Sequence, residues 1–207
     1  MRSHPSSALL YDYERCRLGA GLDAAIEAHT ALCADCRDRL AALARTQEPE
    51  PEPLSYDALD KAMTRIDADT SQTLPVGRAR SPGWMDRLAL PNSLDPGQVG
   101  RRRWPVPGVW IAPIGLDEGK AARTYLISVR KGLALPDHSH HGRELTVVLS
   151  GEFADRQGVY GPGDLIECDD RHNHAPHAVS DCVCLIAAEA PIVVAGLLGP
   201  LVRLAGV

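Results

Sequence analysis

The strongest constraint on this chain is a short helical stretch that carries one histidine and two cysteines. His29, Cys33 and Cys36 stand at positions i, i+4 and i+7, which on a continuous helix keeps their side chains within roughly 60° of one another. Such a set suits tetrahedral Zn(II), which then needs a fourth ligand from elsewhere in the chain. His4 is the only other histidine before residue 138, so we expect it to be that ligand. The alternative is that the cysteines are small buried apolar residues of a helix rich in Ala and Leu.

Length and charge limit the classes of protein to which the chain can belong. Its 207 residues fit one large or two small domains. The net charge of −5 argues against direct DNA binding, which depends on clustered Lys and Arg. No apolar run reaches the length of about eighteen residues that a membrane span needs, and the first residues lack the apolar core of a signal peptide. We therefore expect a cytoplasmic protein, in which a Cys-x-x-Cys motif favours metal binding over a structural disulfide.

Helical spacing and proline content divide the first half of the chain. We expect one helix over residues 7–18 and a second helical run from residue 22 or 23 to about residue 45. A break near Leu32 would leave the ligand spacing intact, with Cys-x-x-Cys opening a new helix. Residues 48–53 alternate Glu and Pro and predict a stiff, extended spacer. Residues 56–68 predict a short amphipathic helix, which either folds back on the first helices or helps to embrace a partner.

The second half of the chain has the pattern of an antiparallel β domain. Residues 70–107 are rich in Pro, Gly, Ser and Arg and predict a linker that ends along the surface of the next domain. Short strand candidates separated by turn residues follow, at 109–112, 122–129, 145–149, 151–155, 164–167 and 181–188. The sequence therefore predicts two domains: a small all-α zinc-binding domain over 1–70 and, after a linker over 71–107, an all-β sandwich or barrel over 108–207.

A second group of potential metal ligands lies inside this β domain. On a strand, His138 and His140 point to the same face, and Glu144 follows after a short turn. The fourth ligand must come from a later strand, where the candidates are His172, His174 and His177. Nitrogen and oxygen ligands suit Zn(II), Fe(II), Mn(II) or Ni(II) alike, so these residues leave the metal open. The alternative is a metal-free β domain whose histidines cluster by chance.

Cys182 and Cys184 lie two residues apart on a predicted strand, so their sulfur atoms share one face. We expect buried core thiols here, because a redox role requires exposure and a lowered pKa.

Two family resemblances rest on these motifs. The spacing of the second group matches the first cupin motif without a gap, through the run Gly132, His138, His140, Glu144 and Gly151. The second cupin motif is only partly matched, because its histidine comes late and the asparagine that commonly follows is missing. In cupin-type anti-sigma factors of the ChrR kind, the late histidine stands before a small residue and a proline. His174 stands in this way before Ala175 and Pro176, so the resemblance assigns His174 as the fourth ligand, with His177 as the alternative.

The helical His/Cys motif and the cupin motif together resemble ChrR-type anti-sigma factors across essentially the whole chain. This resemblance implies a cupin barrel, Zn(II) at both sites and a cytoplasmic inhibitor of an extracytoplasmic-function (ECF) sigma factor. The helical domain would block access of the sigma factor to RNA polymerase core. The cupin would govern its release under oxidative stress, such as singlet oxygen or organic hydroperoxides. We expect no catalytic residues. The alternative is a cupin metalloenzyme, either a dioxygenase or an isomerase.

Overall fold

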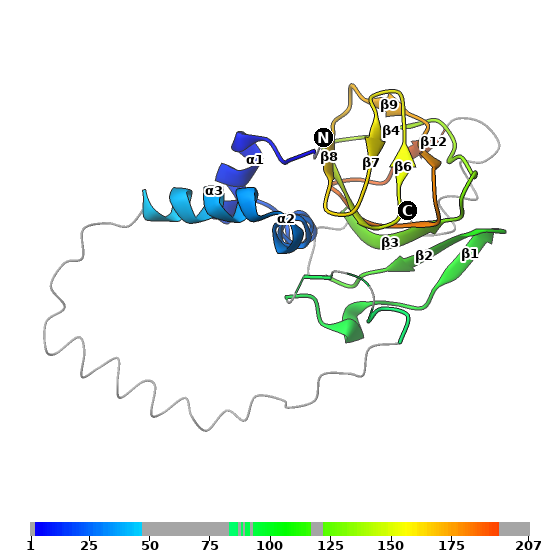
Figure 1. Cartoon of the computed structure of the whole chain (residues 1–207), viewed down its shortest axis with the longest axis horizontal. Helices are drawn as coiled ribbons and strands as arrows, with labels where there is room; N and C mark the ends of the chain where they lie inside the picture. Colours follow the sequence, from blue (N-terminus) through cyan, green and yellow to red (C-terminus); the bar gives the residue numbers. More distant parts are fainter. Residues whose placement is uncertain are drawn as a thin grey trace, which may run out of the picture.

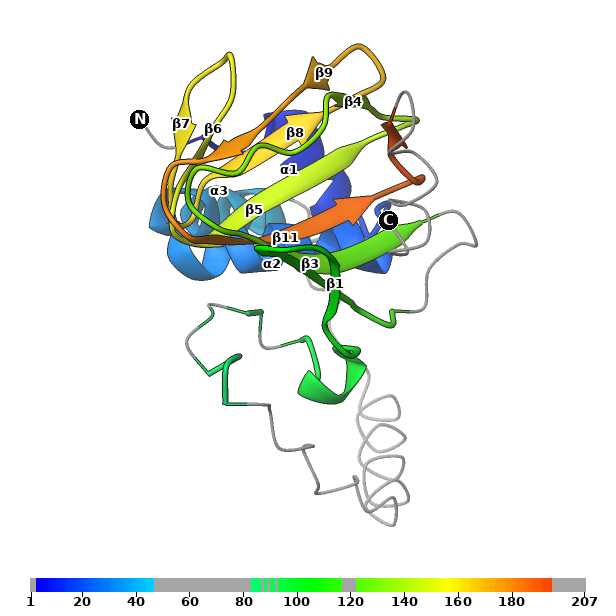
Figure 2. The same cartoon turned by 90° about the vertical axis from the view of Figure 1, so that its right-hand side faces the viewer.

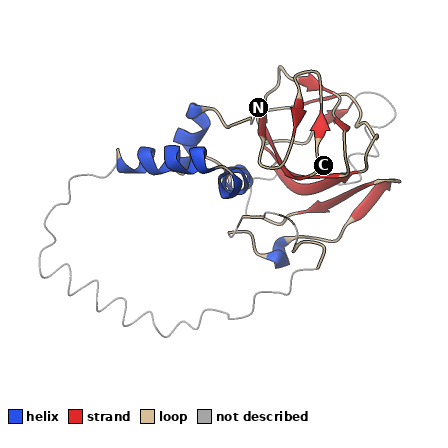
Figure 3. Cartoon of the chain, viewed as in Figure 1, coloured by secondary structure: helices blue, strands red, loops and turns tan. Residues whose placement is uncertain are grey.

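The computed structural model describes residues 3–46, 83–116 except 87, 89 and 92, and 122–194. Within this part of the chain, helices near the N-terminus lie on one side of a set of antiparallel strands (Figure 1, Figure 3). The expected spacer over 48–53, the amphipathic helix over 56–68 and the last residues of the chain lie outside the described residues.

Three helices form the N-terminal part: α1 (Ser7–Glu14), α2 (Ala20–Leu32) and α3 (Ala34–Arg45). Ser6 caps α1 by accepting a hydrogen bond from the backbone N–H of Leu9. The helix ends at Glu14 rather than at residue 18, because Cys16 adopts a left-handed conformation with φ of 51°.

The second helical run is not continuous. Cys33 has an extended backbone (φ −113°, ψ 104°) and stands between α2 and α3. The Cys-x-x-Cys motif therefore opens a new helix, which is the break that the sequence allows near Leu32. Figure 1 places α2 beside the β domain, whereas α3 points away from it.

The strands form three antiparallel sheets. The largest has six strands, in the order β1 (Arg103–Val106), β2 (Val109–Pro113), β3 (Arg123–Val129), β11 (Cys182–Ala188), β5 (Glu144–Ser150) and β8 (Leu165–Cys168). One sheet of three short strands has the order β10 (His177–Ala178), β6 (Phe153–Ala154) and β7 (Val159–Tyr160). The other has the order β12 (Val193–Val194), β4 (His138–Ser139) and β9 (Asn173–His174). Val99, which lies between η1 (Pro96–Gln98) and β1, forms an isolated antiparallel bridge with Ile114, the residue after β2.

The large sheet is covered on both faces, which explains why β5 and β11 are buried at nearly every position. Side chains alternate between the faces of a strand. Leu185 faces a core shared with Ile26 of α2, whereas Cys184 and Ile186 face the core on the opposite side of the sheet. Helix α2 packs against β5 and β11, and the two small sheets lie over the opposite face (Figure 2).

Two sequence expectations about the β domain were incomplete. The three sheets are not closed into a barrel over the described residues, so the expected closed cupin barrel is replaced by an open, layered arrangement. Strand β1 also lies within the segment that we expected to be a linker. In the same segment, Arg102 stacks on Trp84 and Trp110, with its Cζ atom 4.9 Å and 5.5 Å from the two ring centroids. This aromatic packing fixes the segment to the sheet.

Candidate metal centres

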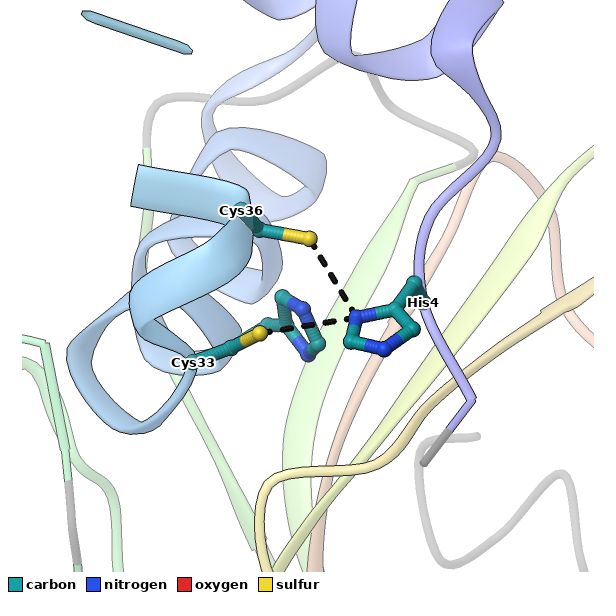
Figure 4. A group of neighbouring side chains, drawn as sticks. His4, Cys33 and Cys36 are labelled. Carbon is teal, nitrogen blue, oxygen red and sulfur yellow. Dashed lines mark hydrogen bonds between the residues drawn. The ribbon is translucent and has the colours of Figure 1, made fainter. Parts of the chain in front are cut away.

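The four residues expected at the N-terminal site come together in the structure. His4, His29, Cys33 and Cys36 each offer one ligand atom, and these atoms lie within 4.8 Å of one another. The Nδ1 atom of His4 is 3.4 Å from the Sγ atoms of both Cys33 and Cys36 (Figure 4). His29, Cys33 and Cys36 are almost completely buried, so the group is closed to solvent on the helical side.

The local structure explains how these side chains meet. His29 lies in the last turn of α2, and its carbonyl oxygen accepts a hydrogen bond from the N–H of Cys33. Cys36 is in the first turn of α3, so the junction between the helices presents both sulfur atoms. His4 reaches them from the segment that precedes α1 (Figure 4).

The donor atoms fit a tetrahedral metal ion. With Zn–S bonds of about 2.3 Å and Zn–N bonds of about 2.0–2.1 Å, a tetrahedral site separates sulfur from nitrogen by roughly 3.6 Å. The observed separations of 3.4 Å are close to this value. The Nδ1 atom of His29 donates a hydrogen bond to the carbonyl oxygen of Gly163 over 2.7 Å, which makes Nε2 the nitrogen that can bind a metal. Burial and a hydrogen bond to Cys33 raise the pKa of Cys36 to about 11, a shift that a bound cation would reverse.

The second group also assembles, and it includes His174. His138, His140, Glu144 and His174 again offer ligand atoms within 4.8 Å of one another. The pairing of β4 with β9 sets His138 opposite His174, with 3.0 Å between their Nε2 atoms. The Nε2 atoms of His140 and His174 are 3.3 Å apart, and the Nδ1 atom of His140 is 3.3 Å from a carboxylate oxygen of Glu144.

The outward nitrogens of two of these histidines have oxygen partners. The Nδ1 atom of His138 donates to the carbonyl oxygen of Pro136 over 2.8 Å, and that of His174 lies 3.5 Å from a carboxylate oxygen of Asp155. Such partners fix the tautomer and direct Nε2 toward the centre of the group. The arrangement therefore resembles a metal site in which hydrogen-bond partners of the non-ligating nitrogens orient the histidine ligands.

The electrostatics of this group favour an ionised Glu144 and a neutral His174. Burial alone would raise the pKa of Glu144, but the hydrogen bond and the charge of His140 outweigh it and lower this pKa below its usual value. Burial and the neighbouring His138 lower the pKa of His174. A carboxylate with neutral imidazoles is the protonation state that binds divalent cations.

The other candidate histidines lie outside the group. The imidazole of His172 pairs with the carboxylate of Asp169, and His177 is exposed on β10. The structure thus groups His174, rather than His177, with the first three ligands.

An apolar cavity of about 270 Å³ adjoins the second group. His138, Glu144 and His174 form part of its wall, and most of the remaining wall is aliphatic or aromatic. Cys182 and Cys184 also line the cavity and are buried, as expected for core thiols. A hydrogen bond between the two thiols lowers the pKa of Cys182 and raises that of Cys184.

Sequence reasoning missed the groups that orient the histidines. Gly163, Pro136 and Asp155 act through backbone carbonyls or a distant carboxylate. Residues 161–164 read Gly-Pro-Gly-Asp, which is typical of a turn, but nothing in the sequence connects this run to a histidine 134 positions away.

None of the described helices combines the length and apolar character that crossing a membrane requires.

An antiparallel β domain with three histidines and a glutamate gathered inside it defines a cupin-like protein. In agreement, residues 95–192 match the family described as the ChrR cupin-like domain. The anti-sigma-E factor ChrR of Cereibacter sphaeroides is 34% identical over 203 residues, which are 93% of this chain and 92% of that protein. A chain in the crystal structure of Rhodobacter sphaeroides SigE in complex with the anti-sigma ChrR aligns with a TM-score of 0.66 at 32% identity. The alignment covers 90% of this chain and 98% of that one. The chain therefore belongs to the ChrR family.

Proposed function

We propose that the chain is an anti-sigma factor that binds and inhibits an ECF sigma factor. The observation that carries this proposal is the similarity to an anti-sigma-E factor over 93% of the chain, which includes the helices as well as the β domain. A similar chain has been crystallised in complex with SigE. The inhibitor acts by binding rather than by catalysis, in the cytoplasm where sigma factors meet RNA polymerase.

We assign Zn(II) to both groups of ligands and the sigma-binding role to the helical domain, within residues 1–70. Zinc at His4, His29, Cys33 and Cys36 would supply no chemistry beyond cross-linking the segment before α1 to the junction of α2 and α3. Structural zinc of this kind contributes on the order of 10 kcal/mol to folding of a small domain. Helix α3 buries only Cys36 among its own residues, so most of its surface is available to a partner.

The binding test uses the full chain and candidate ECF sigma factors of the organism that produces it. A Cys33→Ser variant, shown to lack zinc at the first site, should lose sigma binding in copurification and in direct titration. A Cys16→Ser variant is the matched control, because Cys16 is exposed and lies outside the group. Unchanged affinity of the Cys33→Ser protein would refute the role that we give to the first zinc.

The β domain is assigned to signal reception under oxidative stress, such as singlet oxygen or an organic hydroperoxide. The cavity beside the second group offers a small apolar molecule a route to His138, Glu144 and His174. Of the four ligands, Glu144 matters most for the response, because a carboxylate changes its mode of coordination or leaves more readily than an imidazole. A Glu144→Ala variant should therefore hold its sigma factor on exposure to oxidant, and normal release would contradict this role.

A cupin metalloenzyme is the second candidate, favoured by the same apolar cavity beside three histidines and a glutamate. The two candidates differ in metal content and partner. Two zinc ions per chain with a bound sigma factor support the regulator. One iron ion with oxygen consumption on a small substrate supports the enzyme.

A further inference from the structure

The turn formed by residues 161–164 of the β domain reaches into the N-terminal metal centre. Gly161 accepts a hydrogen bond from the N–H of Asp164 over 2.9 Å, and Gly163 has φ of +88°, so the turn has the features of type II. The carbonyl oxygen of Gly163 accepts the Nδ1–H of His29 over 2.7 Å, and His29 is fully buried. The outer nitrogen of one candidate zinc ligand is thus held by the β domain.

The same turn also holds the segment that carries the other histidine. A carboxylate oxygen of Asp164 accepts the N–H of Ser3 over 2.6 Å, and the carbonyl oxygen of Ser3 accepts the N–H of Leu165 over 3.1 Å. The second carboxylate oxygen of Asp164 accepts the N–H of Gly161, so this buried side chain joins the turn to the N-terminal segment. Ser3 directly precedes His4, which fixes where His4 can lie.

The 161–164 turn is also anchored to β5, the strand that begins at Glu144 of the second metal centre. Val148 of β5 accepts the N–H of Gly163 and donates its own N–H to the carbonyl oxygen of Asp164. Along the ladder between β5 and β8, Val147 pairs with Leu165 and Glu144 pairs with Cys168. At about 3.4 Å per residue, Glu144 lies roughly 14 Å along β5 from the residue that holds the turn.

We infer that the 161–164 turn is a positioning element of the N-terminal metal centre. It orients both histidine ligands, so metal binding and docking of the helices on the β domain stabilise each other. The inference rests on the proposed zinc site at His4, His29, Cys33 and Cys36 and adds the regulation of that site. Because linkage is reciprocal, displacement of the turn weakens metal binding, and loss of the metal weakens docking of the helices.

Two variants disturb the turn in different ways. Gly163→Ala places a side chain on a left-handed residue, 3.2 Å from Cβ of Leu32 in α2. Asp164→Asn keeps the shape of the side chain but offers only one oxygen to the two N–H groups that Asp164 now binds. The matched control is Gly132→Ala, because Gly132 has φ of +80° in the same domain and an added Cβ would meet nothing within 4 Å.

The measurement is the affinity of the full-length protein for Co(II), in competition with a chelator. Thiolate-bound Co(II) absorbs in the near ultraviolet, and the second centre has no sulfur ligand, so this band reports only on the first centre. Both turn variants should weaken Co(II) binding at the first centre by about 10- to 100-fold, as partners of ligating histidines commonly do. Gly132→Ala should change it less than twofold, and metal retention at the second centre should be unchanged in all three proteins.

Equal affinities in the folded turn variants and in the Gly132→Ala protein would overturn the inference and leave the zinc site standing. Absence of the thiolate band in the wild-type protein would overturn both. If Gly163→Ala does not fold, Asp164→Asn alone carries the test.

Discussion

Helix α3 should depend on the first metal centre for its place in the structure, and a Cys36→Ser variant tests this dependence. Cys36 is the only buried residue of α3. Leu40 and Leu43 are only partly buried against the core, and the rest of the helix faces outward. Serine matches the size of cysteine but is a poor ligand for zinc, so the substitution removes the metal with little change in packing.

The structure sets the size of the expected effect. A fully buried leucine contributes about 1.5–3 kcal/mol, so two half-buried leucines together contribute about 3 kcal/mol at most. Structural zinc contributes on the order of 10 kcal/mol. A helix of 12 residues is marginal by itself in water. Loss of the metal should therefore remove most of the free energy that keeps α3 closed.

Amide hydrogen exchange measures this local stability directly. In the Cys36→Ser protein, amides of α3 should exchange more than about 100-fold faster, since about 1.4 kcal/mol corresponds to tenfold. Amides of β3 and β11 should keep their protection, and Cys16→Ser should match the wild type throughout. Protection of α3 that stays within threefold of the wild type would refute the reasoning.

Three further predictions concern the two centres and the fold that supports them. Gly151→Ala should lower stability by more than about 3 kcal/mol in urea unfolding, because Gly151 has φ of +71° and an added Cβ would overlap the backbone of Asp181; an unchanged midpoint contradicts this. Burial, with a smaller contribution from Glu27, raises the pKa of Asp23 from 3.8 to about 6, so the folded state binds its proton more tightly and stability falls as the pH rises from about 4 to about 6. Asp23→Asn removes this loss, so the Tm of the variant relative to that of the wild type should rise as the pH rises from about 4 to about 6. A difference in Tm that stays constant over this range would count against the prediction. His174→Ala should remove metal from the second centre while His177→Ala retains it, and metal analysis giving the reverse order would show that the wrong histidine was assigned.

Sequence spacing was sufficient to group three ligands of each set, whereas His4 followed from the scarcity of early histidines and His174 from the family resemblance. The i, i+4, i+7 pattern brought His29, Cys33 and Cys36 together even though the helix breaks at Cys33. The reason is that the break occurs at a ligand: Cys33 ends α2 with a hydrogen bond to His29 and precedes the first turn of α3. The spacing of ligands along the sequence therefore predicts the group correctly even where one helix ends and the next begins.

What the sequence could not predict depends on contacts between distant segments. Gly163 holds His29 through a backbone carbonyl, which has the same chemistry in every residue and leaves no mark in the sequence. The stacking of Arg102 on Trp84 and Trp110 also joins segments that the fold of the sheet brings together, so residues rich in Pro and Gly were interpreted as a linker. Sheet closure depends on the way short strands meet, and strand patterns alone did not distinguish an open sandwich from a barrel.

The zinc K-edge X-ray absorption spectrum of the pure full-length protein tests the central claim most directly, that two cysteines and two histidines hold a metal that shapes the helical domain. The account predicts sulfur scatterers at about 2.3 Å from zinc, which Cys33→Ser diminishes and Cys16→Ser leaves in place. A zinc environment of nitrogen and oxygen alone, or the absence of zinc, would contradict it.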